Sequence, residues 1–206
     1  DRAYKIQQNR ADLGLENTAA NNPLLPDFAQ AGKADRSSGK LGGDFPWAKE
    51  RLRVLSAATP SIALSEYRKG IDGYERNLSD AQKYGMALAY LENNQAGTAE
   101  TLLNGLAKSR PDNLWISIAH AESAHALGDS ALARVRFEQL LTRFPNNRAV
   151  ILAYAESLLE QNEKASALRA QEILRTLSND SAEDVVFQRS FARAFELSGN
   201  TLRAAE

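Results

Sequence analysis

Small and apolar residues recur in the second half of the chain with the spacing of amphipathic helices. They lie three to four residues apart, so within each segment they share one face of a predicted helix. The same set returns after an interval of about 34 residues, with polar residues between its members. The matched positions are Ala99, Leu103 and Leu106 in the first copy and Ala133, Phe137 and Leu140 in the second. The pattern therefore predicts successive copies of one helical unit, and the interval is their repeat period.

Prolines and alanines recur along the chain with the same period. Pro111 and Pro145 are separated by one period and are expected to stop the second helix of each unit. Ala87 has counterparts one and two periods later, at Ala121 and Ala155. Because an alanine lets two helix axes approach closely, these positions are expected at helix crossings.

The third unit is predicted to depart from the strict period. After Asn162 the sequence is expected to carry about three extra residues before the apolar face resumes, and the fourth unit follows. The resumed face is assigned to Ala170, Leu174 and Leu177, and the fourth unit to Phe191, Ala192, Phe195 and Gly199. We expect about three and a half units, with the last one truncated.

A small residue at each helix crossing, a bulky apolar residue one turn later and a proline between units of about 34 residues resemble the tetratricopeptide repeat. Two short antiparallel helices cannot bury their apolar stripes alone, so each hairpin must pack on the next. The fold class expected is all-α, a helical hairpin array that forms a right-handed α-solenoid. An arbitrary helical bundle with coincidental spacing is the alternative.

The chain is expected to have three parts. Residues 1–44 form an N-terminal linker segment that is partly irregular, because residues 31–44 are rich in Gly, Ser and charge. Residues 45–78 form two helices that pack on the array, and residues 79–206 form the repeats. The residues expected to be buried in those two helices are Trp47, Leu52, Val54, Leu55, Ile62, Leu64, Tyr67 and Tyr74. The chain begins without methionine and stops inside a unit, so we expect it to be an excised segment.

Composition narrows the classes of partner. Lys and Arg number 25 against 26 Asp and Glu, so the formal net charge of -1 gives no electrostatic reason to expect nucleic acid or an anionic membrane surface. No apolar stretch approaches the roughly 20 residues that a transmembrane helix needs. The absence of cysteine excludes disulfides, but it fits an oxidising compartment as well as a reducing one.

Catalytic signatures are missing as well. The sequence contains no HExxH zinc motif, no GxSxG elbow, no Walker loop and no dinucleotide fingerprint. The two histidines, His120 and His125, are five residues apart, and on a helix they point in directions roughly 140° apart. That geometry is poor for one metal ion. We therefore expect no catalytic residue, metal site or cofactor in this chain, and we expect His120 at a helix interface.

A stacked array has a concave wall lined by the first helix of each unit, where peptides and partner domains commonly dock. Aromatic, acidic and basic residues are expected along this wall in that order, and Trp, Tyr and Arg are common interface hot spots. The predicted partner-binding residues are Tyr84, Leu88, Leu91, Trp115, Ile118, Glu122, His125, Leu152, Glu156, Arg189 and Arg193. The alternative is that Trp115 and Tyr84 pack between repeats and that the arginines pair with nearby glutamates.

The segments GGDFPWAKERLRVLSAATP and DRAYKIQQNRADL resemble the downstream half of the beta-barrel assembly-enhancing protease family of bacterial periplasmic zinc metallopeptidases. The resemblance implies a non-catalytic substrate-recognition or regulatory module for outer-membrane protein quality control, with zinc in the catalytic domain of the parent protein. The implied partner is an extended or partly folded polypeptide, the chain's own peptidase domain or an outer-membrane assembly component. The alternative is a scaffold or adaptor with no associated peptidase.

Overall fold

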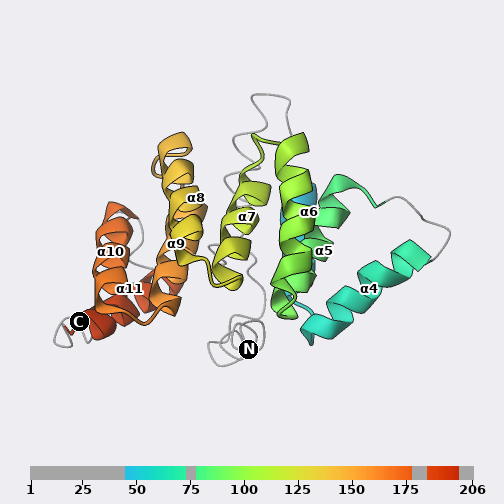
Figure 1. Cartoon of the computed structure of the whole chain (residues 1–206). Coiled ribbons are helices and arrows are strands. Elements are labelled where there is room, and N and C mark those ends of the chain that lie inside the picture. Colours follow the sequence, from blue (N-terminus) through green and yellow to red (C-terminus); the bar gives the residue numbers. More distant parts are fainter. Residues whose placement is uncertain (1–44, 73–77, 178–184, 200–206) are drawn as a thin grey trace. The chain divides into compact units, whose positions relative to one another are not determined.

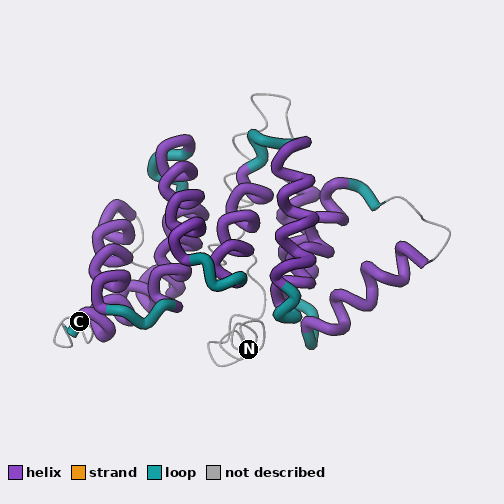
Figure 2. Tube along the Cα trace, in the orientation of Figure 1, coloured by secondary structure: helices purple, strands orange, loops and turns teal. Residues whose placement is uncertain are grey.

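The computed structural model of the chain describes residues 45–72, 78–177 and 185–199. Over these residues all regular structure is helical, in nine α-helices and one short 3₁₀ helix (Figure 1, Figure 2). The prediction of an all-α fold is therefore confirmed. The predicted linker segment 1–44 and the predicted core residue Tyr74 lie outside the described residues. None of the described helices has the length and apolar content needed to cross a bilayer.

The described residues fall into two compact units. The first unit holds α3 (Phe45–Leu55), α4 (Pro60–Asp72), α5 (Asp80–Glu92), α6 (Ala96–Ser109), α7 (Leu114–Ala126) and the start of α8 (Ser130–Arg143). The second unit holds the rest of α8, α9 (Arg148–Glu160), α10 (Lys164–Leu174), the 3₁₀ helix η2 (Arg175–Leu177) and α11 (Val185–Ser198).

The predicted repeat period is present in the helix boundaries. The first helices α5, α7 and α9 begin at equal intervals of about 34 residues, and so do the second helices α6, α8 and α10. The turn between the two helices of a unit contains a residue with positive φ at Asn94, Gly128 and Asn162, again one period apart. Glycine and asparagine adopt this left-handed conformation more readily than other residues. The same turn therefore closes three successive hairpins.

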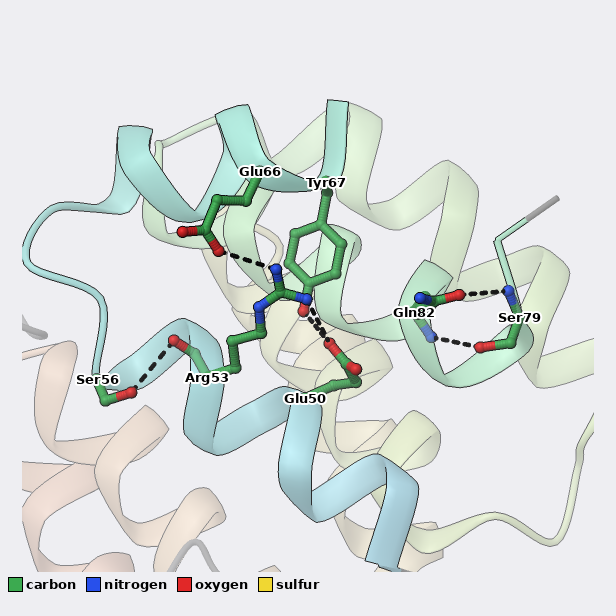
Figure 3. A network of polar contacts seen from close by, with 7 residues as sticks. All are labelled: Glu50, Arg53, Ser56, Glu66, Tyr67, Ser79 and Gln82. Carbon is green, nitrogen blue, oxygen red and sulfur yellow. Dashed lines mark hydrogen bonds and ion pairs between the residues drawn. The ribbon is translucent and has the colours of Figure 1, made fainter. Parts of the chain in front are cut away.

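Helix caps follow the same period. Ser79, Asn113 and Asn147 are each separated by one period, and each accepts a hydrogen bond from a backbone N–H in the first turn of α5, α7 or α9. At α5 the cap is reciprocal, because Gln82 also accepts a hydrogen bond from the Ser79 backbone (Figure 3). Such caps satisfy N–H groups that have no partner within the helix.

The prediction that the register shifts after Asn162 is wrong. The buried residues Ala167, Gln171 and Leu174 lie one period after Ala133, Phe137 and Leu140, so the third unit keeps the strict period. The extra residues come before the end of α11 instead, since the positive-φ residue Gly199 lies 37 residues after Asn162, three more than one period. Two of the residues assigned to the shifted face, Ala170 and Leu174, are nevertheless buried, whereas Leu177 in η2 is only half-buried.

Gln171 explains why the apolar pattern was misleading. It occupies the position of Leu103 and Phe137 in the earlier units and is buried. Its side-chain Nε2 donates to the Ala194 carbonyl oxygen at 2.9 Å and to Ser198 Oγ at 2.6 Å, both on α11. A polar side chain can replace an apolar one in a core when its hydrogen bonds are satisfied.

The repeat positions form the core of each unit. Ala87, Ala121 and Ala155 are fully buried at the predicted crossings, and the matched apolar positions of α6 and α8 are buried as well. In the second unit Phe137 stacks on Tyr154 of α9, with ring centroids 5.0 Å apart. Burying one such side chain contributes roughly 1.5–3 kcal/mol. α6 packs between α5 and α7 in the first unit, and α10 packs between α9 and α11 in the second.

The two helices expected before the repeats are α3 and α4, and both pack against α5. α3 buries Trp47, Ala48, Val54 and Leu55 on one face, whereas Leu52 is half-buried. α4 buries Ala63, Leu64 and Tyr67. The expected burial of Ile62 is wrong, because this side chain is 45% exposed on the opposite face of α4.

Candidate interaction surface

The face predicted to line a groove in the first unit is buried in this structure. Tyr84, Leu88, Trp115 and Ile118 lie in the core, and Leu91, Glu122 and His125 are half-buried. In the second unit Leu152 is fully buried. The expectation that these five core residues face a partner is therefore corrected: Tyr84, Leu88, Trp115, Ile118 and Leu152 pack inside the molecule.

In the first unit, α3 covers the face that carries Tyr84 and Glu122. The indole ring of Trp47 meets the ring of Tyr84 edge to face, with centroids 5.7 Å apart and an interplanar angle of 72°. This is a favourable geometry for an aromatic pair. One turn further along α3, Arg51 reaches across α5 to α7. A helix that precedes the repeats thus occupies part of the surface on which the sequence predicted partner binding, at Tyr84 and Glu122.

Arg51 binds the Glu122 carboxylate through both terminal nitrogens of its guanidinium group. Its Nη2 lies 2.9 Å from Glu122 Oε1 and its Nη1 lies 3.3 Å from Oε2. The same Nη1 donates to Tyr84 Oη at 3.4 Å. Only 4% of the Arg51 side chain and 13% of the Glu122 side chain are exposed. Two parallel hydrogen bonds between charged groups fix the orientation of α3 as well as its position.

Burial and the neighbouring polar groups shift the pKa values of Arg51 and Tyr84. Burial lowers the pKa of Arg51, but the Glu122 carboxylate and the Tyr84 hydroxyl outweigh this effect and the pKa is raised overall. Burial raises the pKa of Tyr84 to about 12, although the neighbouring Arg51 opposes the rise. Arg51 therefore stays charged and Tyr84 stays protonated at every physiological pH.

A second polar network joins α3 to α4 (Figure 3). Tyr67 Oη donates to Glu50 Oε2, and Arg53 Nη2 donates to Glu66 Oε2 at 2.9 Å. Arg53 also lies over the Tyr67 ring, with its Cζ 4.9 Å from the centroid. Glu50 and Arg51 are the only charged residues that are buried in the described part of the chain. These two neighbours on α3 fix the helix to α4 and to the repeats, respectively.

Gly85 on α5 allows this network to approach the repeats. A Cβ atom at position 85 would lie 2.7 Å from Tyr67 Cζ and 2.9 Å from Glu50 Oε2. One and two periods later the same position holds Ala119 and Ala153. The first repeat therefore lacks a side chain at the point where α3 and α4 dock.

His120 lies between α6 and α7, as the sequence predicted. Its Nε2 lies 3.1 Å from Glu100 Oε1, and Ser123 Oγ donates to the other carboxylate oxygen of Glu100 at 2.5 Å. Glu100 thus ties the two helices together at a half-buried position. Across the described ranges, no three His, Cys, Asp or Glu residues are grouped in a way that could hold a metal ion.

The remaining predicted residues lie in the second unit. Glu156 is half-buried on α9, and Arg189 and Arg193 are exposed on α11. Arg193 Nη2 lies 3.3 Å from the Leu159 carbonyl oxygen and 3.3 Å from Asn162 Oδ1, at the C-terminal end of α9. Cations are favoured at helix C-termini, where carbonyl groups lack partners. The two arginines are one turn apart and share a solvent-facing side of α11.

Comparison with known proteins agrees with this architecture. A family model for the tetratricopeptide repeat matches residues 119–147, from within α7 to the N-cap of α9. No curated protein sequence and no solved structure gives a significant match. Together with the repeat period of the helices, the match supports an all-α tetratricopeptide-repeat array over the described residues. The tetratricopeptide-repeat match supports a protein–protein interaction module.

Proposed function

We propose that this chain is the partner-binding module of a larger periplasmic protein, a zinc-dependent metallopeptidase of outer-membrane protein quality control. The observation that carries the binding role is the repeat period of the helices together with the tetratricopeptide-repeat match at residues 119–147. The association with a peptidase and the periplasmic location are supported by the sequence resemblance of residues 42–60. Zinc would belong to the catalytic domain of the parent protein, as the same resemblance implies.

Arg189 and Arg193 suit a partner that carries carboxylates. Both side chains are exposed on the same side of α11, and guanidinium groups bind carboxylates through paired hydrogen bonds. An extended or partly folded polypeptide is the partner that we propose for this surface. The alternative partners for the two arginines are the chain's own peptidase domain and an outer-membrane assembly component.

Binding of an unfolded β-barrel polypeptide tests the proposal. The chain is immobilised, and its affinity for a urea-unfolded outer-membrane protein is measured by biolayer interferometry after dilution of the urea. We expect Arg189→Glu with Arg193→Glu to weaken binding at least about tenfold, which corresponds to about 1.4 kcal/mol. Arg134→Glu, on an exposed arginine of α8 in the same unit, is the matched control and should leave the affinity unchanged. Equal binding by all variants, or no binding by the original chain, would contradict the proposal.

The link to a peptidase has its own test. The gene region upstream of Asp1 should encode an HExxH helix and a signal peptide, and the chain alone should show no metal-dependent proteolysis. Cleavage of casein by the purified chain that a chelator abolishes would contradict a non-catalytic role. A parent protein without any catalytic domain would instead indicate an adaptor.

A further inference from the structure

α3 lies on the first unit in the way that an amphipathic helical peptide lies in a binding groove. Its buried residues fall on one face, at the i, i+4 and i+7/i+8 positions that are typical of helix-in-groove recognition. They are Trp47, Ala48, Arg51, Val54 and Leu55, with Glu50 buried beside them against Tyr67 of α4. The opposite face, with Lys49 and Arg53, is exposed. α3 thus has the pattern of a helical ligand.

The contact between α3 and the repeats differs chemically from the contacts within the repeats. In the first two units the matched repeat positions are filled by Ala, Leu and Phe, whereas α3 places the buried charge of Arg51 against α7 and that of Glu50 between α4 and Gly85. Removing charges from water is costly, and apolar residues of similar size often stabilise a permanent contact as well or better. Arg51 Nε is also buried without a hydrogen-bond partner. These features fit a helix that is selected for specific and exchangeable docking rather than for maximal stability.

We propose that the face of α5 and α7 around Tyr84 and Glu122 recognises an amphipathic helix with an aromatic residue and an arginine four residues later. α3 is the resident occupant of this site and supplies Trp47 and Arg51 at that spacing. A partner helix of the same chemistry competes with α3 for the Tyr84 ring and the Glu122 carboxylate. The inference rests on the proposed role of the chain as a protein-binding module and specifies one class of its partners.

Charge and shape both support this choice of partner. Glu122 offers a half-buried carboxylate whose two oxygens are both used by one guanidinium group. Tyr84 adds an aromatic ring for edge-to-face contact and a hydroxyl oxygen within reach of the same guanidinium. Lysine cannot reproduce the paired hydrogen bonds, because its ammonium group is a single point charge. The site therefore favours arginine over lysine in a partner helix.

A labelled peptide with the sequence of residues 44–57 tests the proposal in trans. Its affinity is measured by fluorescence anisotropy against the original chain and against Trp47→Ala with Arg51→Ala, in which α3 is weakened as a competitor. We expect the double variant to bind the peptide at least about tenfold more tightly than the original chain, because the site is vacated more often. Absence of binding to the double variant, or equal affinity for both chains, would overturn the proposal, provided circular dichroism shows that the variant is folded.

Charge reversal shows whether the peptide uses the same contacts as α3. A peptide with Arg51→Glu should bind the double variant at least about tenfold more weakly, and Glu122→Arg in the chain should restore much of the lost affinity. The matched control is Lys49→Glu in the peptide, which makes the same charge change on the exposed face of α3. A similar loss from both reversals would overturn the proposed site, because it would indicate general electrostatic attraction.

If the double variant does not fold, hydrogen exchange tests whether α3 leaves the repeats in the original chain. In the original chain, backbone amides of α3 should exchange at least about tenfold faster than those of α5 to α7, through an opening that the repeats do not share. Equal protection of these helices would overturn the proposal. The peptide assay needs no natural partner, so its failure leaves the proposed binding of unfolded polypeptides intact. If unfolded polypeptides do not bind but the peptide binds as expected, the proposed helix-binding site stands.

Discussion

At the residue scale, the docking of α3 and α4 depends on the absence of one side chain. Gly85 faces the Tyr67 hydroxyl and the Glu50 carboxylate, and both groups would collide with a Cβ atom. Glu50 in turn accepts the hydrogen bond of Tyr67. Whether position 85 tolerates a larger residue therefore depends on the helices that pack on α5 and not on α5 itself.

Gly85→Ala should lower the free energy of unfolding by about 1–3 kcal/mol, because overpacking at a tight contact outweighs the higher helix propensity of alanine. The measurement is urea unfolding followed by circular dichroism. Gly105→Ala is the matched control, since a Cβ at this α6 position meets nothing within 4 Å. The control should be neutral or stabilise by up to roughly 1 kcal/mol. Stabilisation by both substitutions would contradict the close approach at Gly85.

Gln171 is a second residue whose role depends on its partners. Gln171→Ala should destabilise the chain by about 2–4 kcal/mol, because it creates a cavity and leaves two buried acceptors on α11 without their donor. Gln139→Ala on the exposed surface of α8 should change stability by less than about 0.5 kcal/mol. Thermal and urea unfolding measure both effects. If Gln171→Ala matched the control, the hydrogen bonds to α11 would be unimportant.

Tyr84 gives the first unit a sensitivity to high pH. Its pKa in the folded chain is about 12, whereas an unfolded tyrosine ionises near 10. The stabilising effect of this group is complete below pH 10 and is lost as the pH rises through 12, because the unfolded state releases its proton first. Two pKa units correspond to at most about 3 kcal/mol. Urea unfolding between pH 9 and 11.5 should show a steeper loss for the original chain than for Tyr84→Phe, and parallel curves would contradict the raised pKa.

At the element scale, much of the repeat pattern was predictable from the sequence. The matched alanines and apolar residues of α6 and α8 identified the helical faces, and the prolines marked the helix ends, because these signals depend on neighbours within one helix. The register of α10 was misread, because a buried glutamine with satisfied hydrogen bonds carries no hydrophobic signal. The periodicity of a sequence shows which positions are polar. It does not show which of these polar positions are buried with their hydrogen bonds satisfied.

The covering of α5 and α7 by α3 could not be predicted in the same way. Arg51 and Glu122 are 71 residues apart in the sequence, and neither residue type indicates a buried pair on its own. Tyr84 and Trp115 were correctly placed on the first helices of their units, yet Tyr84 is covered by a helix outside the repeats. A candidate signal was available in α3, where Arg51 falls on the same helical face as Trp47, Val54 and Leu55.

At the scale of the whole molecule, the chain combines a repeat array with a helix of its own that already occupies part of it. The first unit holds the covered face, and the second unit holds the exposed arginines of α11. A right-handed superhelix remains a prediction from the repeat pattern. If the parent protein is a peptidase, exchange of α3 for a substrate helix would couple partner binding to the segment that precedes the repeats.

A double-mutant cycle on Arg51 and Glu122 tests the central claim most directly. The free energies of unfolding are measured in urea for the original chain, Arg51→Ala, Glu122→Ala and the double variant. If α3 is held on the repeats by this buried pair, the two substitutions should couple by at least about 1 kcal/mol. Substitutions that add to within about 0.3 kcal/mol would show that α3 does not occupy the face of α5 and α7 in solution.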